Sequence, residues 1–138
     1  MKSKRRYLVV GLGILGRAVV NNLTDLGAEV IAVDRSNELV NKFNLDTQVA
    51  IECEATDRQA LEQLDVENLD SAIVCIGEDF KSAVLITAHL ADLGVKKVIV
   101  RANDTTSASI LKRVGATDIF FVESEMGREI ANKVFSAE

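Results

Sequence analysis

Residues 11–16 read GLGILG, and residues 30–34 read VIAVD. The glycines have the spacing G-x-G-x-x-G, and Asp34 follows the last of them by 18 residues, near the usual spacing of about 20. An apolar run over 7–10 precedes the glycines and an amphipathic run follows them. This order of strand, glycine turn, helix and acidic strand end predicts a binding site for a nucleotide.

Each glycine of the motif has a separate physical task. Gly11 permits a tight turn, Gly13 lets the backbone approach a diphosphate, and Gly16 lets helix and strand pack closely. The N-terminus of the following helix offers unpaired N–H groups and a partial positive charge to the phosphates. The motif therefore predicts where the phosphates of a ligand would lie.

The acid at the end of the second strand bears on which nucleotide fits. A carboxylate at Asp34 accepts hydrogen bonds from ribose hydroxyls and repels a 2′-phosphate, which favours an adenosine nucleotide or NAD over NADP. Arg35 works against this exclusion, because an arginine can accommodate a 2′-phosphate. The alternative is a glycine turn with a surface acid and no ligand.

Six short, β-branched apolar runs alternate with amphipathic ones, as expected for strands buried on both faces of a parallel sheet. The predicted strands are 7–10, 30–33, 49–51, 72–76, 98–100 and 119–122, and the predicted helices are 15–26, 36–44, 57–64, 80–93, 104–114 and 124–136. We expect an α/β, Rossmann-like, doubly wound parallel six-stranded sheet with strand order 3-2-1-4-5-6. It fills residues 1–138 as a single domain, which leaves no length for a second, substrate-binding domain.

Two further strand ends face the same crevice, because ligands of open α/β sheets bind outside the carboxyl ends of the strands. After the third strand, Ala55 and Thr56 are placed to flank an adenine, and after the fourth, Gly77 leaves room for a ribose. Asp57 and Asp79 follow them. Either they face the ligand or they merely begin helices, where carboxylates are stabilised.

Composition narrows the possible partners. The chain has 138 residues, 48% hydrophobic and 27% charged, with a net charge of −5, so bulk attraction to nucleic acid or anionic lipid is not expected. No apolar run reaches the roughly 18 residues of a membrane helix, so we expect no direct membrane insertion. Cys53 and Cys75 are isolated, and we expect buried, reduced thiols and no metal site.

Catalytic groups are not evident. The only histidine, His89, lies well past the start of its helix and so away from the crevice, where it packs against a helix or is partly exposed. The only tyrosine, Tyr7, lies in the first strand. With no assembled triad, metal motif or P-loop lysine, we expect no catalytic residues and a module that binds a nucleotide without transforming it.

Several pieces of the chain together resemble one family, the N-terminal Rossmann domain of RCK (regulator of potassium conductance) proteins, also called the Ktr/Trk N-terminal or TrkA-N domain. The resemblance covers nearly the whole chain. Besides the glycine motif and Val33-Asp34, it rests on Ala55-Thr56-Asp57, Val74-x-Ile76-Gly77, Val100-Arg101-Ala102-Asn103, Leu111-x-x-x-Gly115-Ala116-Thr117-Asp118, Glu123 and Met126-Gly127.

The resemblance implies a cytoplasmic regulatory domain that is peripheral to the inner face of the cell membrane, held there by a membrane-embedded potassium transporter subunit. It implies homodimers that assemble toward an octameric ring, and potassium flux gated allosterically by ATP, ADP or NAD(H). Arg101 matches a position near the phosphates or the subunit interface. The resemblance and the glycine motif together give the following expected nucleotide contacts: Gly11, Gly13, Ile14, Leu15, Gly16, Asp34, Arg35, Ala55, Thr56, Asp57, Ile76, Gly77 and Arg101.

The chain also departs from the family. Many ATP-responsive members carry an arginine where this chain has Ile14, which weakens the expectation of a contact to the γ-phosphate. Many have Pro-Glu before the last helix, where this chain has Val122-Glu123, and Glu123 is a candidate to help bind a cation near the phosphates. The family's C-terminal ligand-binding domain does not follow within these residues.

The last predicted helix, 124–136, carries an apolar stripe of Met126, Ile130 and Val134 with Phe135 beside it. The stripe is wide enough to cover its own sheet or to contribute to dimer contacts, and the sequence leaves both open. Two other functions also stay open: the cofactor-binding domain of an NAD-dependent oxidoreductase, and an assembly module that binds no nucleotide.

Overall fold

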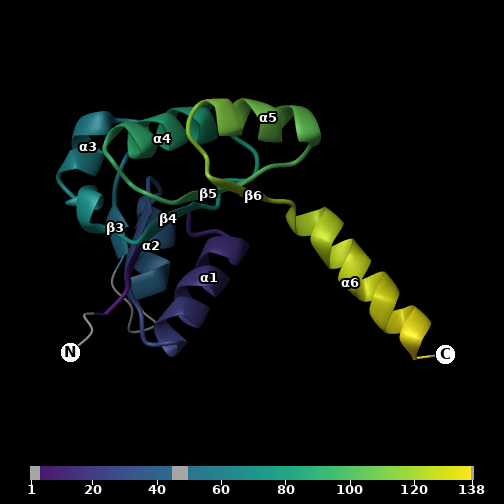
Figure 1. The fold of residues 1–138 in the computed structure, drawn as a ribbon. Coiled ribbons are helices and arrows are strands. Elements are labelled where there is room, and N and C mark those ends of the chain that lie inside the picture. The colour runs from purple at the N-terminus through teal and green to yellow at the C-terminus, as the bar shows by residue number, and fades with distance from the viewer. Residues whose placement is uncertain (1–3, 45–49, 138) are drawn as a thin grey trace.

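Six parallel strands form one sheet in the order β3-β2-β1-β4-β5-β6, as predicted, with helices on both faces (Figure 1). The computed structural model describes residues 4–44 and 50–137. The strands are β1 Arg6–Val10, β2 Glu29–Asp34, β3 Ala50–Glu52, β4 Ser71–Val74, β5 Val98–Arg101 and β6 Asp118–Phe120. The helices are α1 Ile14–Asp25, α2 Asn37–Asn44, α3 Arg58–Glu62, α4 Phe80–Asp92, α5 Thr105–Arg113 and α6 Val122–Ser136, with a 3₁₀ turn at Val66–Asn68.

Some element boundaries differ from the prediction. The last strand ends at Phe120, and Val122 already belongs to α6, so the apolar run over 119–122 spans a strand end and a helix start. Helix α3 is shorter than the predicted range 57–64, since Asp57 is its N-cap and Gln63 is its C-cap. In the predicted third strand, Val49 lies outside the described residues, and β3 begins at Ala50.

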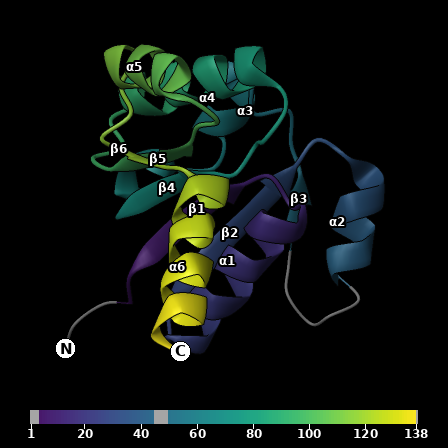
Figure 2. The same cartoon turned by 90° about the vertical axis from the view of Figure 1, so that its right-hand side faces the viewer.

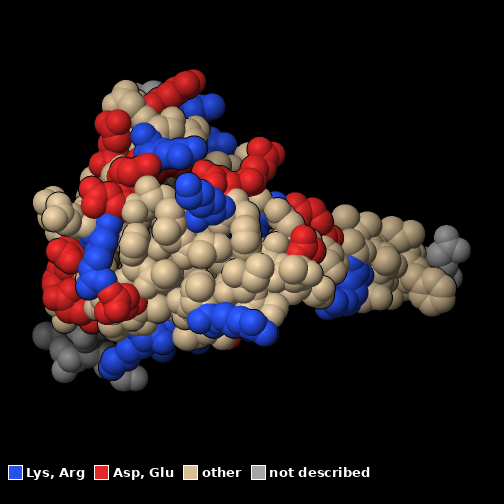
Figure 3. All heavy atoms as spheres, turned by 90° about the horizontal axis from the view of Figure 1, so that it is seen from above, with Lys and Arg blue, Asp and Glu red and all other residues tan. Residues whose placement is uncertain are grey.

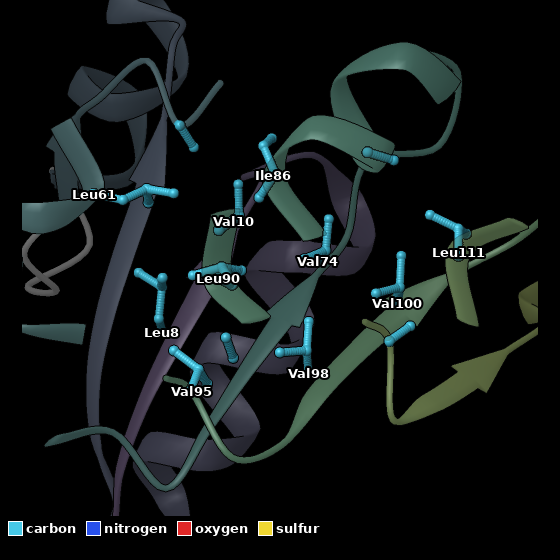
Figure 4. Packing of buried hydrophobic residues seen from close by; sticks show 14 of the residues in the cluster. Leu8, Val10, Leu61, Val74, Ile86, Leu90, Val95, Val98, Val100 and Leu111 are labelled. Carbon is cyan, nitrogen blue, oxygen red and sulfur yellow. The ribbon is translucent and has the colours of Figure 1, made fainter. Parts of the chain in front are cut away.

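The sheet is buried on both faces because its strands are apolar at successive positions. Leu8, Val10, Val74, Val98 and Val100 point to the side covered by α3, α4 and α5, where they meet side chains such as Leu90 and Leu111 (Figure 4). Val9, Ala32 and Ile73 point to the side of α1 and α2, against Val20 and Phe43. Each face thus has its own core, and the carboxyl ends of the strands are held in a fixed order.

The helices begin and end where short-range chemistry favours it. Ser36 Oγ accepts the N–H of Leu39, and the Asp104 carboxylate accepts the N–H of Ser107, so both act as the predicted N-caps. Gly94 and Gly115 follow α4 and α5 with positive φ, a backbone conformation that glycine adopts without strain.

Helix α6 does not cover its own sheet. It projects from the rest of the molecule as a separate arm in Figure 1 and is seen in front of α1 in Figure 2, and none of its residues is buried. In Figure 3 this arm is mainly uncharged toward its far end, where Ile130, Val134 and Phe135 are exposed by 54%, 62% and 85%. Of the two possibilities that the sequence leaves open, burial of the stripe on its own sheet alone is therefore wrong. Over the described residues, no helix has the length and apolarity that crossing a bilayer requires.

Candidate functional site

A pocket of about 230 Å³ lies at the carboxyl ends of β1, β2, β3 and β4. The loops that follow these four strands form its walls, because parallel strands bring their carboxyl ends to one edge of the sheet. The lining residues are Val10, Gly11, Gly13, Asp34, Arg35, Cys53, Glu54, Ala55, Thr56, Cys75, Ile76, Gly77, Asp79, Ser82 and Ile86.

The structure separates the thirteen predicted contacts into two groups. It brings Gly11, Gly13, Asp34, Arg35, Ala55, Thr56, Ile76 and Gly77 together in the pocket lining, and it places Ile14, Leu15, Gly16, Asp57 and Arg101 outside that lining. Ile14 and Leu15 open α1 directly after Gly13, so their backbone still adjoins the pocket. Contact with a nucleotide stays a prediction for both groups.

Gly11 and Gly16 are required by the protein itself. Gly11 has φ +104°, and its backbone N–H donates to Val33 O, which ties the loop to β2. A Cβ at Gly16 would lie 1.6 Å from Gly11 O. These two glycines therefore build the tight turn and the close helix–strand contact that the motif predicts.

Gly13 is different, because nothing in the protein demands a glycine there. Its φ of −70° suits any residue, and a Cβ would meet no atom within 4 Å. The direction of that Cβ is open space beside the N-terminus of α1. A missing side chain at this position keeps the N–H groups of the helix open to an anionic ligand.

Asp34 serves the loop as well as the pocket. Its Oδ2 accepts the N–H of Leu12 at 2.7 Å, and its Oδ1 accepts the N–H of Ser36 at 2.8 Å. The carboxylate therefore fixes the glycine loop to the start of α2, a task that spacing alone did not reveal. Carboxylate oxygens have further lone pairs, so both can still accept a ribose hydroxyl.

The loop after β3 forms one wall of the pocket with Ala55 and Thr56. Asp57 turns away and caps α3, where its Oδ1 accepts the N–H of Gln59 at 3.0 Å. His89 supports this wall from behind, since its Nε2 lies 3.0 Å from Thr56 O. As predicted, His89 lies outside the pocket lining, but it contacts the loop that forms this wall.

The loop after β4 forms the opposite wall, which includes Gly77. The space beside Gly77 is taken by the protein: a Cβ there would lie 3.1 Å from Arg101 Nη1. The missing side chain at Gly77 therefore makes room for the Arg101 guanidinium, and contact between Gly77 and a ribose stays a prediction. Asn103 Nδ2 donates to Gly77 O at 2.8 Å and adds a second link from the chain after β5 to this wall.

Arg101 joins the pocket wall to α6. Its side chain is 19% exposed, and its Nη2 lies 2.5 Å from Oε1 of Glu123 in the first turn of α6. Glu123, the candidate cation ligand, is thus engaged by an arginine. Over the described residues, no group of three or more His, Cys, Asp or Glu side chains gathers as a metal site.

Both cysteines lie at strand ends and line the pocket. Burial raises the pKa of the Cys75 thiol to about 12, although the charge of Arg101 partly opposes this shift. Cys53 is only half-buried, so the prediction of a buried thiol is wrong for it. Burial first, and then the charges of Glu54 and Asp57, raise the pKa of Cys53. Both thiols are therefore protonated at neutral pH.

Several lining residues were not among the predicted contacts, although the sequence carries part of the signal for them. Ser82 and Ile86 lie three and seven positions after Asp79, the N-cap of α4. At this helical spacing they share the face of α4 that lines the pocket. Cys53 and Cys75 directly follow β3 and β4, which placed them at the crevice.

Similarity to known proteins identifies the family of this chain. The family model of the TrkA-N domain matches residues 7–122, which include every strand after the first residue of β1 and the whole pocket. The chain belongs to the TrkA-N domain family. This TrkA-N domain is also 32% identical over 133 residues to the Ktr system potassium uptake protein C of Bacillus subtilis. That match covers 96% of this chain and 60% of the relative.

Solved structures share the fold. The NAD(P)-binding domain of an exopolyphosphatase-related protein from Archaeoglobus fulgidus superimposes with a TM-score of 0.86 at 23% identity, covering 96% of this chain and 99% of that one. GsuK bound to ADP superimposes with a TM-score of 0.80 at 21% identity, covering 97% of this chain and 35% of that one. Both support the Rossmann-like sheet order of this TrkA-N domain.

Proposed function

We propose that this TrkA-N domain binds an adenine nucleotide or NAD(H) in the pocket and thereby regulates a potassium transport system. The observation that carries the proposal is Gly13. Neither its φ nor its packing needs a glycine, whereas a diphosphate approaching the N-terminus of α1 does. The open space at Gly13 adjoins the Asp34 carboxylate in one pocket.

The pocket suits the adenosine end of such a ligand. Its volume of about 230 Å³ is below the roughly 300–1,000 Å³ that encloses a drug-sized ligand, so the rest of the ligand lies over the open glycine loop. Asp34 accepts the ribose hydroxyls, and the adenine lies between Ala55 with Thr56 on one wall and Ile76 on the other. This arrangement uses six of the eight predicted contacts in the pocket lining: Gly11, Gly13, Asp34, Ala55, Thr56 and Ile76.

Related proteins support the choice of ligand and of system. The relative from Bacillus subtilis is a potassium uptake protein, one structural neighbour is an NAD(P)-binding domain, and another was solved with ADP. This chain spans 60% of the length of that relative. We therefore propose a cytoplasmic domain that acts on a membrane-embedded potassium transporter subunit.

The projecting helix α6 supplies the route from ligand to partner. Its exposed apolar residues Met126, Ile130, Val134 and Phe135 suit a second copy of the chain, in a homodimer that assembles toward an octameric ring. Arg101 packs against the pocket wall at Gly77 and pairs with Glu123 of α6. Ligands that move this wall differently would favour different arrangements of paired domains.

Calorimetric titration of the purified protein with NAD⁺, NADH, ADP and ATP tests the proposal. We expect saturable binding of at least one of them below millimolar concentration, and no change in the ligand after prolonged incubation. Oxidation of NADH in the presence of added carbonyl compounds would instead identify the cofactor-binding domain of an oxidoreductase. No binding of any of the four at millimolar concentration would leave an assembly module that binds no nucleotide.

A further inference from the structure

Two oppositely charged residues face each other across the mouth of the pocket. Arg35 directly follows β2, and Asp79 directly precedes α4; their Nη1 and Oδ2 atoms lie 3.8 Å apart. Since β2 and β4 are the two neighbours of β1 in the sheet, the pair bridges the strands on either side of the glycine loop. We call these two residues the mouth pair.

Asp79 is the fixed member of the mouth pair. Its two oxygens accept the N–H and the hydroxyl of Ser82 at 3.1 and 2.6 Å, which caps α4. These hydrogen bonds lower the pKa of the Asp79 carboxyl group, with smaller help from the charge of Arg35, so it is ionised at neutral pH. Arg35 is the movable member, because its side chain is 65% exposed.

The mouth pair leaves the pocket poor in available positive charge. Among the described residues of the pocket lining, the charged side chains are those of Asp34, Arg35, Glu54 and Asp79, so Arg35 is the one cation. The nearby Arg101 is engaged by Glu123. An added phosphate at the ribose would meet carboxylates on several sides and an arginine that is already paired.

The lack of free positive charge in the pocket matters most for a 2′-phosphate on the ribose. Sites for NADP use an arginine near the end of the second strand to pair with the 2′-phosphate, whereas sites for NAD use a carboxylate there. This chain has both residues side by side, Asp34 and then Arg35. What decides between them is whether the guanidinium is available.

We propose that Asp79 is a specificity-determining residue. It holds Arg35 across the pocket mouth, so that the guanidinium is not free to pair with the 2′-phosphate of NADP(H). The pocket then takes NAD(H) and other adenine ligands with an unmodified ribose. This inference rests on the proposed function, because it concerns the same pocket and its adenosine end.

Titration of NAD⁺ and NADP⁺ against Asp79→Asn tests the proposal, because the two ligands differ only in the 2′-phosphate. Asparagine also caps helices well, so α4 keeps its start while the charge is lost. We expect wild type to bind NAD⁺ more tightly than NADP⁺. In Asp79→Asn, the ratio of the NADP⁺ Kd to the NAD⁺ Kd should fall about three- to fivefold, which is the effect of one exposed ion pair. The ratio changes because NADP⁺ binding tightens more than NAD⁺ binding, since only NADP⁺ has a 2′-phosphate to pair with the released guanidinium.

Two further variants separate the mouth pair from a general charge effect. In an Arg35→Gln background, Asp79→Asn no longer improves NADP⁺ binding, because no guanidinium is left to release. Asp104→Asn, the same change at the cap of α5 outside the pocket lining, leaves the ratio of the two Kd values as in wild type.

The outcomes distinguish this inference from the proposed function. NAD⁺ binding with an unchanged ratio in Asp79→Asn would overturn the role of Asp79 alone. An equal gain in NADP⁺ binding with and without Arg35 would also overturn it, because repulsion by the carboxylate would then be sufficient. Failure of wild type to bind NAD⁺, NADH, ADP and ATP would overturn both proposals.

Discussion

Gly13 and Gly16 belong to one motif, but the structure gives them opposite roles. A side chain at Gly13 meets open space, and one at Gly16 meets the backbone oxygen of Gly11. One glycine is explained by a ligand and the other by the fold. This contrast allows binding and folding to be tested separately.

Gly13→Asn is expected to fold normally and to lose ligand. Its φ is compatible with any residue and asparagine is a favourable N-cap, so the free energy of unfolding changes by less than about 0.5 kcal/mol. The new side chain enters the space of the diphosphate and weakens nucleotide binding at least about tenfold, or about 1.4 kcal/mol. Gly16→Ala is the matched contrast, and overpacking there destabilises the protein by about 3 kcal/mol. Urea unfolding and calorimetry measure both effects, and tight binding by folded Gly13→Asn would contradict the proposed site.

The two thiols of the pocket are expected to differ in reactivity. Thiol reagents attack the thiolate, and burial raises the pKa of Cys75 to about 12, so Cys75 stays unmodified in the native protein at pH 8. Half-buried Cys53 reacts slowly, and faster as pH rises. Absorbance with a disulfide reagent should count no more than one thiol in native wild type, none in Cys53→Ser and two in unfolded wild type. Bound nucleotide should slow the reaction of Cys53, and modification of Cys75 in native Cys53→Ser at the same rate would disprove this assignment.

Single residues also show where sequence reasoning ends. The spacing from Gly16 predicted that Asp34 lies at the crevice, because a motif fixes the end of a strand. It could not show that the same carboxylate binds the N–H groups of Leu12 and Ser36, since these bonds depend on loop conformation. Removing Asp34 would therefore disturb the loop as well as the ligand, and Gly13 gives the cleaner test.

At the scale of elements, apolar periodicity was sufficient for the sheet and its order. Runs such as Val98–Arg101 are too short and too β-branched for helices, and right-handed crossovers leave few topologies. The ends were less predictable, because an apolar residue such as Val122 fits both a strand end and a helix start. Helix caps were readable where a carboxylate or hydroxyl precedes an amphipathic run, as at Ser36 and Asp104.

The cap of α5 gives a prediction about pH. The hydrogen bonds of Ser107 lower the folded-state pKa of the Asp104 carboxyl group below its ordinary value of 3.8. Its contribution to stability is therefore fully present above about pH 3.8 and is lost as pH falls through the lower folded-state value. Asp104→Ala should be less stable than wild type at pH 7, and this difference should shrink toward pH 2.5. Urea unfolding across this range measures it, and a difference that grew on acidification would contradict the cap.

At the scale of the whole molecule, the position of α6 was the feature that the sequence could not decide. An apolar stripe at helical spacing looks the same whether it faces its own sheet or another chain. In the structure, α6 leaves Ile99 and Phe120 of the sheet only partly buried and exposes its own stripe. Two apolar surfaces of one chain are thus incompletely covered, which is the arrangement expected of a subunit rather than of an isolated domain.

Ile130→Glu is expected to weaken self-association without unfolding the domain. Ile130 is 54% exposed at the middle of the stripe, so a charge there makes little difference to the monomer but would be buried in a dimer. Sedimentation velocity over a concentration series should show wild-type dimers and a dimer Kd raised at least about tenfold in Ile130→Glu. Asn132→Glu adds the same charge to the same helix away from the stripe and should associate like wild type. Equal weakening by both variants would point to charge repulsion rather than to the apolar stripe, and a monomeric wild type at all concentrations would remove α6 from the proposed route between nucleotide and transporter.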